Sequence, residues 1–170
     1  MASSPVKPGD SVPDVTLYDG KPDNKVKLRD LYKGKKGLIF GLPGAFTPNC
    51  STYQLPHFLT RNEELRDAGI EVMVCVAVND PFVMEAWAKH NKVDGQIHML
   101  ADKDMELTKA LGIVMDCEPV LGNKRMKRWS GIIEDNVFKT VNLETKDGGN
   151  AYTISGVDTI LGQLKELDAK

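Results

Sequence analysis

Residues 38–51 read LIFGLPGAFTPNCS, and this stretch joins an expected strand to an expected helix. Residues 38–40 are a short apolar run of the kind that forms strands, and a Pro-Gly pair then turns the chain. Thr47 is a residue type that caps helices, and Pro48 suits the first helical position because its missing N–H would have no partner there. The stretch therefore predicts a strand, a tight turn and the start of a helix.

Cys50 falls in the first turn of this helix, three residues after Thr47. The backbone N–H groups of a first turn have no partner within the helix, and together with the helix dipole they favour a negative charge. We therefore expect the position to favour the thiolate, which is the nucleophilic form of cysteine. Most free cysteines are buried structural residues, but a strand, a turn and a helix start that converge on one thiol favour an activated nucleophile.

Outward from this stretch, strands and helices alternate. Strands are expected over residues 15–18, 72–78, 97–100, 130–133 and 137–141, and helices over 48–66, 81–90, 104–111 and 157–167. The run at 72–78 is continuous and rich in valine, which is typical of a strand buried on both faces. Ser155 and Asp158 resemble a capping box for the last helix. The alternation predicts an α/β fold with a mixed sheet, in one domain over residues 1–170.

The composition excludes several classes of protein. The chain has 170 residues, of which 41% are hydrophobic and 27% charged, as is ordinary for a globular domain. A net charge of −2 gives no basic surface for nucleic acid or an anionic membrane. No apolar run approaches the ~20 residues that a membrane span needs. Three cysteines suit neither a disulfide scaffold nor a four-cysteine zinc site. The N-terminus lacks a signal peptide, so we expect a cytoplasmic location, or a mitochondrial one if a transit peptide has been removed.

Residues 43–51, PGAFTPNCS, resemble the active-site signature of peroxiredoxins, in the version of the five-type or type II subfamily. The resemblance continues in order and spacing through LP at 55–56, VNDPFV at 78–83 with Trp87, LAD at 100–102 and KRWS at 127–130. It covers nearly the whole chain. It implies a thioredoxin-like fold, with helices on both faces of a mixed central sheet, and a thiol peroxidase that uses no metal or other cofactor.

The resemblance also implies four catalytic residues. Cys50 would attack the terminal peroxide oxygen as a thiolate and become a sulfenic acid. The Thr47 hydroxyl would bind the peroxide and the sulfur, and Pro43 would shield the sulfur from water. Arg128 would reach in from a later strand, where its planar cation suits holding a thiolate and polarising the O–O bond. Without the resemblance, Arg128 reads as one more solvated residue of the basic run at 124–128.

Two residues that follow Cys50 in the same expected helix, Pro56 and His57, have different expected roles. Pro56 removes a backbone hydrogen bond and weakens the turn before it. In relatives this turn unwinds to expose the oxidised sulfur, and a weakened turn would ease that motion. His57 departs from the family, in which a small residue is usual. We interpret His57 as a tolerated surface substitution, or as a residue that tunes the rim of the pocket.

The resolving thiol is the open question. A sulfenic acid is resolved by a second thiol, and in animal five-type relatives this thiol lies just before the final helix. Ile154 occupies that position here. Cys75 matches a resolver assigned in plant type II relatives, but its expected strand predicts a buried, inert thiol. Cys117 has acidic neighbours in a polar loop, and we expect it to be exposed and incidental, with an intermolecular or signalling role left open. We predict a one-cysteine cycle in which glutathione, glutaredoxin or thioredoxin attacks the Cys50 sulfenate.

Two classes of function fit these residues. The first is a thiol-dependent peroxidase for hydrogen peroxide, alkyl hydroperoxides and peroxynitrite, with a role in antioxidant defence and redox homeostasis. The second is a redox-sensing interaction protein that passes the oxidation of Cys50 to a partner or exposes a chaperone surface. A thiol–disulfide oxidoreductase would need a Cys-x-x-Cys pair, whereas residue 47 is threonine. Metal-dependent hydrolysis is disfavoured because the three histidines, His57, His90 and His98, lack ligand spacing.

The family resemblance further implies a non-covalent homodimer. Phe46, Phe82 and Trp87 are candidates for its interface, and packing in the core of a single chain is the equal alternative for all three.

Overall fold

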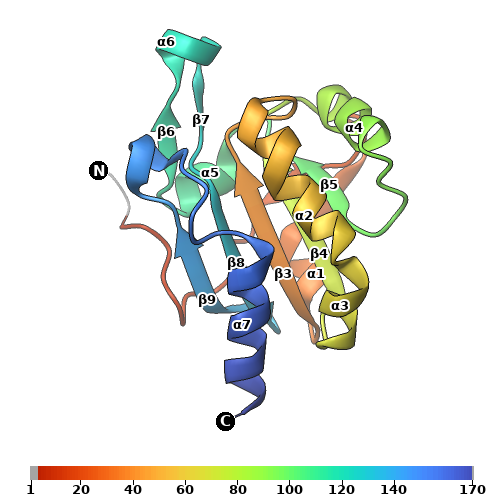
Figure 1. Ribbon diagram of the computed structural model, residues 1–170. Coiled ribbons are helices and arrows are strands. Elements are labelled where there is room, and N and C mark those ends of the chain that lie inside the picture. The colour runs from red at the N-terminus through yellow and green to blue at the C-terminus, as the bar shows by residue number, and fades with distance from the viewer. Residues whose placement is uncertain (1–3, 170) are drawn as a thin grey trace.

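A seven-stranded mixed sheet forms the centre of the computed structural model, which describes residues 4–169 (Figure 1). Its strands follow the order β2-β1-β5-β4-β3-β8-β9 across the sheet. Their bounds are β1 Thr16–Tyr18, β2 Lys25–Lys27, β3 Lys36–Leu42, β4 Val72–Ala77, β5 His98–Ala101, β8 Trp129–Glu134 and β9 Val137–Leu143. The central strands β3, β4 and β5 are parallel, and the outer pairs are antiparallel. Parallel strands next to one another place their carboxyl ends at one edge, where β3 delivers the chain to Cys50.

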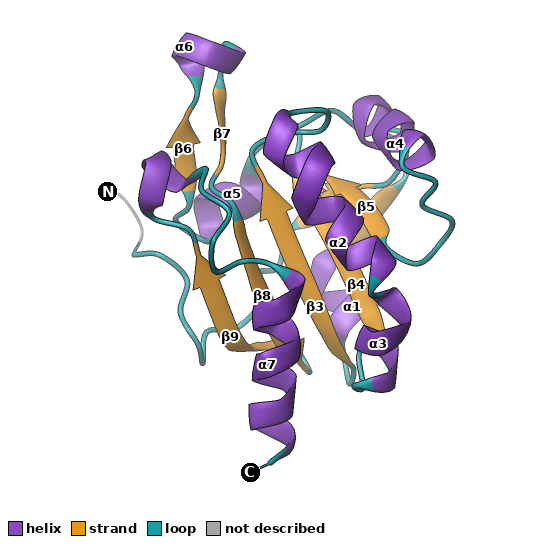
Figure 2. Ribbon diagram, in the orientation of Figure 1, coloured by secondary structure: helices purple, strands orange, loops and turns teal. Residues whose placement is uncertain are grey.

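Helices cover both faces of this sheet (Figure 2). One apolar layer packs α2, α3, α4 and α7 against the sheet, and the other packs α1 and α5 against the opposite face. The bounds are α1 Leu28–Tyr32, α2 Leu55–Thr60, α3 Asn62–Asp67, α4 Pro81–His90, α5 Glu106–Ala110 and α7 Val157–Asp168. The expected α/β fold, with a mixed sheet between two layers of helices, is confirmed.

Strand β3 contributes to both layers, because successive side chains point to opposite faces. Leu38, Phe40 and Leu42 belong to the layer under α2, whereas Ile39 belongs to the other layer. Gly41 is the point of closest approach, because a Cβ there would collide with the Trp129 indole and the Met126 sulfur. The sheet thus needs a glycine just before the turn that leads to the site.

A smaller hairpin stands apart from the main sheet. Strands β6, Val114–Asp116, and β7, Lys124–Met126, pair with each other and are joined by the short helix α6, Glu118–Leu121. Figure 1 shows this excursion projecting from the end of the molecule at which β3 terminates. The sequence did not predict it, nor β2 and α1, because elements of three to five residues are too short to show a hydrophobic period.

Two local predictions are wrong in an informative way. The helix expected over residues 48–66 begins at Pro48, but passes through a π-helical turn, η1 Cys50–Gln54, and is interrupted at Arg61 between α2 and α3. The capping box expected at α7 does not form. Gly156 is the N-cap residue, and the Ser155 hydroxyl donates instead to Glu144, at 2.7 Å.

Candidate active site

Cys50 lies at the start of the π-helical turn and has no exposed surface. The helical backbone begins two residues earlier, and the Ser51 N–H donates to the Thr47 carbonyl at 2.9 Å. The Thr47 side chain does not cap this helix as expected. Its hydroxyl donates to the Gly44 carbonyl at 2.8 Å, within the turn that follows β3. The cysteine is therefore in the first turn, as predicted, while Thr47 stabilises the turn before it.

Arg128 meets the thiol from the beginning of β8. Its Nη1 lies 3.3 Å from the Cys50 Sγ, and both residues are fully buried. The same Nη1 donates to the Gln54 Oε1 at 2.5 Å, and the Gln54 Nε2 is 3.5 Å from the Gly41 carbonyl. The cation thus lies between the sulfur and a carboxamide at the two ends of one helical turn. The sequence interpretation missed Gln54, although a polar residue four positions after Cys50 shares its helix face.

A loop near the C-terminus holds the remaining guanidinium nitrogens. Arg128 donates through Nε to the Asn150 carbonyl at 3.3 Å, and through Nη2 to the Asn150 Oδ1 at 3.0 Å. The Arg128 backbone N–H also donates to the Gly149 carbonyl at 2.8 Å. All three side-chain nitrogens therefore have partners, which fixes the plane of the guanidinium. No sequence signal pointed to Asn150, because its role depends on a contact across the fold.

Helix α4 and the strand before it support the other side of the site. The Ala45 N–H donates to the Asn79 Oδ1 at 2.8 Å, and the Trp87 indole N–H donates to the Ser51 hydroxyl at 3.0 Å. Trp87 is fully buried, so it belongs to the core of the chain. Phe46 and Phe82 are instead 51% and 60% exposed. The loop and the first turn of the Cys50 helix are thus attached to the core by two side chains.

A cavity of about 260 Å³ opens beside this site. The loop of Cys50 forms one wall, the β6–α6–β7 excursion forms another, and Asn150 joins them. Its lining residues are Pro43, Thr47, Pro48, Met115, Asp116, Cys117, Pro119, Val120, Leu121 and Asn150. Because Asn150 also binds Arg128, the cavity and the buried thiol belong to one site.

The prediction that Cys117 is exposed is wrong. Cys117 is only 6% exposed, and it lines the cavity as the N-cap residue of α6. The prediction failed because the polar stretch around it folds back as a hairpin instead of remaining a loop. Burial raises the pKa of the Cys117 thiol, and the positive charge of Arg125 opposes that effect while Asp116 adds to it.

Cys75 is fully buried on β4, as the sequence predicted. It pairs with Phe40 across the sheet and lies in the apolar layer that also contains Cys50. Burial raises the pKa of the Cys75 thiol well above its usual value, and the neighbouring Cys50 raises it further. Cys75 is therefore a neutral thiol at pH 7. All three cysteines are free.

Glu144 fixes the C-terminal loop that carries Asn150. Its buried carboxylate accepts the backbone N–H groups of Thr153, Ile154 and Ser155 at 2.8, 2.9 and 3.0 Å. It also accepts the hydroxyls of Thr153 and Ser155 at 2.6 and 2.7 Å. Burial by itself raises the pKa of Glu144, but these hydrogen bonds outweigh it, and the pKa lies below its usual value. The loop is thus folded around an ionised carboxylate at neutral pH.

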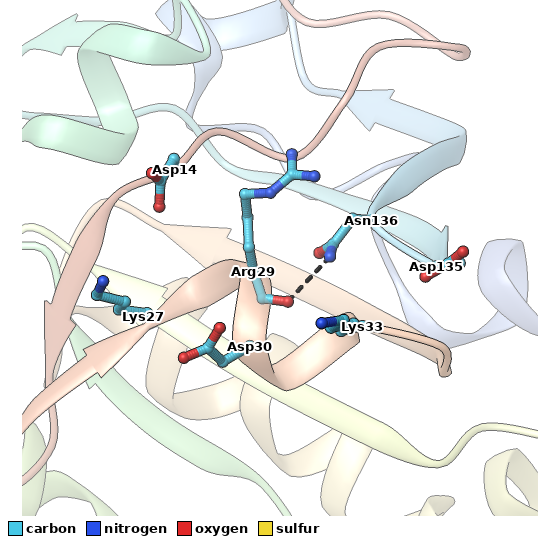
Figure 3. Close-up of a pocket in the computed structure, with 7 residues that line it drawn as sticks. All are labelled: Asp14, Lys27, Arg29, Asp30, Lys33, Asp135 and Asn136. Carbon is cyan, nitrogen blue, oxygen red and sulfur yellow. Dashed lines mark hydrogen bonds between the residues drawn. The ribbon is translucent and has the colours of Figure 1, made fainter.

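A second cavity, of about 510 Å³, is a different feature (Figure 3). Charged residues line it at the other end of β3, where Lys36 pairs with Glu134 near the β8–β9 turn. Figure 3 shows the Asn136 side chain donating to the Arg29 carbonyl, at 2.9 Å. None of its lining residues contacts Cys50, so its size does not make it the candidate site.

Within residues 4–169, no three histidine, cysteine, aspartate or glutamate side chains are grouped as metal ligands would be. None of the helices over the same residues has the length and apolar character needed to cross a membrane.

The arrangement suits a small oxidant that reacts at sulfur. A buried thiol contacts a fixed cation, which can stabilise the negative charge of an attacking sulfur and the charge that develops on a leaving oxygen. The adjoining cavity is large enough for a small molecule and is mostly apolar in its lining. The residues that the sequence singled out, namely Cys50, Thr47, Arg128 and Pro43, all lie at the cavity or at the thiol beside it.

Comparisons with known proteins point the same way. The family model described as Redoxin matches residues 7–161. Peroxiredoxin-2E, chloroplastic, of Arabidopsis thaliana is 39% identical over 162 residues, which are 92% of this chain and 68% of that protein. Two solved structures align with 94–95% of this chain, and each alignment covers 99% of the solved chain. They are peroxiredoxin 5 of Alvinella pompejana, with 34% identity and a TM-score of 0.85, and reduced Prx3 of Vibrio vulnificus in complex with H₂O₂, with 35% and 0.86.

Proposed function

This chain belongs to the peroxiredoxins of the type II and five-type kind, and from that premise we propose that Cys50 is the thiolate that attacks the peroxide. The family is one of thiol-dependent peroxidases of antioxidant defence, and the thioredoxin-like fold expected from the sequence is confirmed. The observation that carries the assignment of Cys50 is the 3.3 Å contact between its sulfur and the buried guanidinium of Arg128. Neither Cys75 nor Cys117 contacts an arginine in this way within residues 4–169.

Each of the other site residues has a role that its chemistry supports. Arg128 would hold the thiolate and then bind the peroxide oxygens, because its Nη1 lies against the sulfur. Thr47 lines the cavity where a peroxide would lie, and because its hydroxyl proton is donated to the Gly44 carbonyl, the hydroxyl oxygen would accept a hydrogen bond from the peroxide. Pro43 contributes apolar surface that keeps water from the sulfur. In this step the sulfur attacks the terminal oxygen, the O–O bond breaks, and water or an alcohol leaves.

The cavity supports organic hydroperoxides as well as hydrogen peroxide as substrates. A wall of Met115, Val120 and Leu121 can bury an alkyl group that hydrogen peroxide does not possess. The similar Vibrio vulnificus protein has been solved with H₂O₂. Peroxynitrite is a third candidate substrate.

For the return step, we propose a one-cysteine cycle with glutathione, glutaredoxin or thioredoxin as the external reductant. The position expected for a resolving thiol is Ile154, and Cys75 is held in the core. The external thiol would condense with the sulfenic acid to give a mixed disulfide and water, and a second thiol would release Cys50.

Mass analysis of peptides tests this cycle. After one equivalent of peroxide and then glutathione, we expect Cys50 to carry one glutathione while Cys75 and Cys117 stay reduced. A stoichiometric disulfide between Cys50 and either other cysteine would contradict the one-cysteine cycle. Peroxide consumption tests the rival function in the same samples, because a redox sensor would stop after about one peroxide per protein, whereas a peroxidase turns over with thiol.

We further propose a non-covalent homodimer and a cytoplasmic location. The exposed rings of Phe46 and Phe82 lie on the loop before the Cys50 helix and on α4, and they support an apolar interface there. Sedimentation over a range of concentrations should show a monomer–dimer equilibrium that Phe82→Ser shifts toward monomer. A concentration-independent monomer would contradict the dimer. The location is less constrained, because similar plant proteins include chloroplastic and mitochondrial forms.

A further inference from the structure

Three ring side chains join the helix of Cys50 to the C-terminal loop. The His57 Nδ1 lies 2.9 Å from the Tyr152 hydroxyl. The ring of Tyr53 stacks on that of Tyr152, with centroids 6.4 Å apart and 13° between the planes. His57 packs against both tyrosines, with centroids 5.8 and 6.1 Å away. Tyr53 belongs to the π-helical turn and His57 to α2, so both lie on the segment that begins at Cys50.

The cluster joins two segments, the C-terminal loop and the helix of Cys50, that differ in the contacts that hold them. On the loop side, Glu144 accepts five hydrogen bonds from residues 153–155, immediately after Tyr152. The Tyr152 hydroxyl also lies against the backbone of Gly156, where an added Cβ would be only 2.8 Å away. On the helix side, Tyr53 lies in a π-helical turn, a form that proteins use only in short pieces. The rings therefore attach the π-helical turn to a loop that is held by a buried carboxylate.

This attachment matters because the Cys50 sulfur is completely buried. A peroxide is small enough to enter the cavity, but a thiol of the size of glutathione or a protein must approach the sulfenic acid along the axis of the S–O bond. That approach requires the turn at Cys50 to open. Any contact that favours the closed turn slows reduction of the sulfenic acid without blocking its formation.

We propose that His57, Tyr152 and Tyr53 form a latch that keeps the Cys50 turn closed and so sets the lifetime of the buried sulfenic acid. The inference rests on the proposed function of Cys50. In the closed turn a second peroxide reacts with the sulfenic acid, Cys50–SOH + ROOH giving Cys50–SO₂H + ROH, which removes the enzyme from the cycle. In the open turn a thiol gives Cys50–S–SR and water. The latch thus decides between overoxidation and recycling.

The latch gives His57 a role beyond that of a tolerated surface substitution. A small apolar residue at this position would have no ring nitrogen to hydrogen-bond with the Tyr152 hydroxyl and no ring for either tyrosine to pack against. His57 and Tyr152 do not touch the reacting atoms. They act through the turn and are positioning residues.

Near-isosteric variants test the latch by removing the hydrogen bond while keeping the rings. In Tyr152→Phe and in His57→Phe, backbone amide exchange over residues 51–55 of the reduced protein should rise about fivefold, the size expected for one hydrogen bond of ordinary net strength. The double variant should rise no further than either single variant, because both remove the same bond. The yield of sulfinic acid per turnover, at fixed peroxide and thiol, should fall by a similar factor.

Tyr53→Phe is the matched control, because the Tyr53 hydroxyl makes no hydrogen bond within residues 4–169 and its ring is retained. It should change neither the exchange nor the sulfinic acid yield. Any of three results would overturn the latch. Amide exchange could be unchanged in both single variants, or the increases in exchange could be additive in the double variant. The yield of sulfinic acid could also fail to follow amide exchange. Exchange is measured without peroxide, so failure of Cys50 as the peroxidatic residue would appear separately, as absence of turnover in the wild type.

Discussion

Replacing Cys50 by serine is expected to abolish peroxide turnover. A serine hydroxyl remains protonated at pH 7 beside Arg128, and it cannot accept oxygen from a peroxide as sulfur does. The second-order rate constant with hydrogen peroxide should fall by at least about 10⁴, as when other enzymes lose a nucleophile. Rapid-mixing measurements with thioredoxin and with glutathione plus glutaredoxin, supplied separately, would check this loss and identify the better reductant.

Cys75→Ala is the matched control for this loss. Cys75 shares the apolar layer with Cys50 and is equally buried, but it does not line the cavity beside the site, and it contacts no arginine within the described residues. Its removal should leave the rate constant with peroxide unchanged, apart from some loss of thermal stability from the small cavity created. Turnover that survives in Cys50→Ser, or disappears in Cys75→Ala, would overturn the assignment of the reactive thiol.

The fold class and the position of the thiol could be predicted from the sequence because both depend on local sequence patterns. The apolar run at 72–78 and the Pro-Gly turn determine their own conformations, and the helix start at Pro48 was recognisable from four residues. Arg128 is different, because it is separated from Cys50 by 78 residues. Its side chain reads as solvated in the sequence, and only the resemblance to a family brought it to the sulfur.

The errors at Ser155 and Cys117 share one physical cause, which is packing between segments that are separated in the sequence. Ser155 has the sequence context of a helix cap, but a buried Glu144 offers it a stronger, charged acceptor. Cys117 was read as exposed because its neighbours are polar, yet the hairpin places it on the cavity wall. The placement of these two side chains depends on long-range packing that no local pattern records. The error at Thr47 is local, because its hydroxyl donates to the carbonyl of Gly44, three residues earlier, and not to the helix that follows.

Loss of Arg128 should be the second largest defect. Arg128→Met keeps much of the side-chain length but removes the cation from the Cys50 sulfur, and it leaves Gln54 and Asn150 without their donor. We expect the rate constant with peroxide to fall about 10²–10³-fold, as for the loss of one preorganised donor in other active sites. Alkylation of Cys50 by iodoacetamide at pH 7 should also slow, because the cation that can stabilise negative charge on the attacking sulfur is gone.

Arg128→Lys separates the charge from its geometry. An ammonium group can contact the sulfur but cannot also bind Gln54 and Asn150 in one plane. The rate constant with peroxide should therefore lie between those of the wild type and Arg128→Met. The rate of alkylation should stay closer to that of the wild type. Arg29→Met is the control, because the Arg29 Nη1 makes a comparable bond to the Val12 carbonyl, at 2.7 Å, on the far side of the molecule from the cavity. If the rate constant of Arg128→Lys with peroxide equals that of the wild type, the positive charge alone suffices, and the hydrogen bonds that fix the guanidinium plane do not contribute to catalysis. If Arg29→Met is as defective as Arg128→Met, the loss reflects stability instead of chemistry at the sulfur.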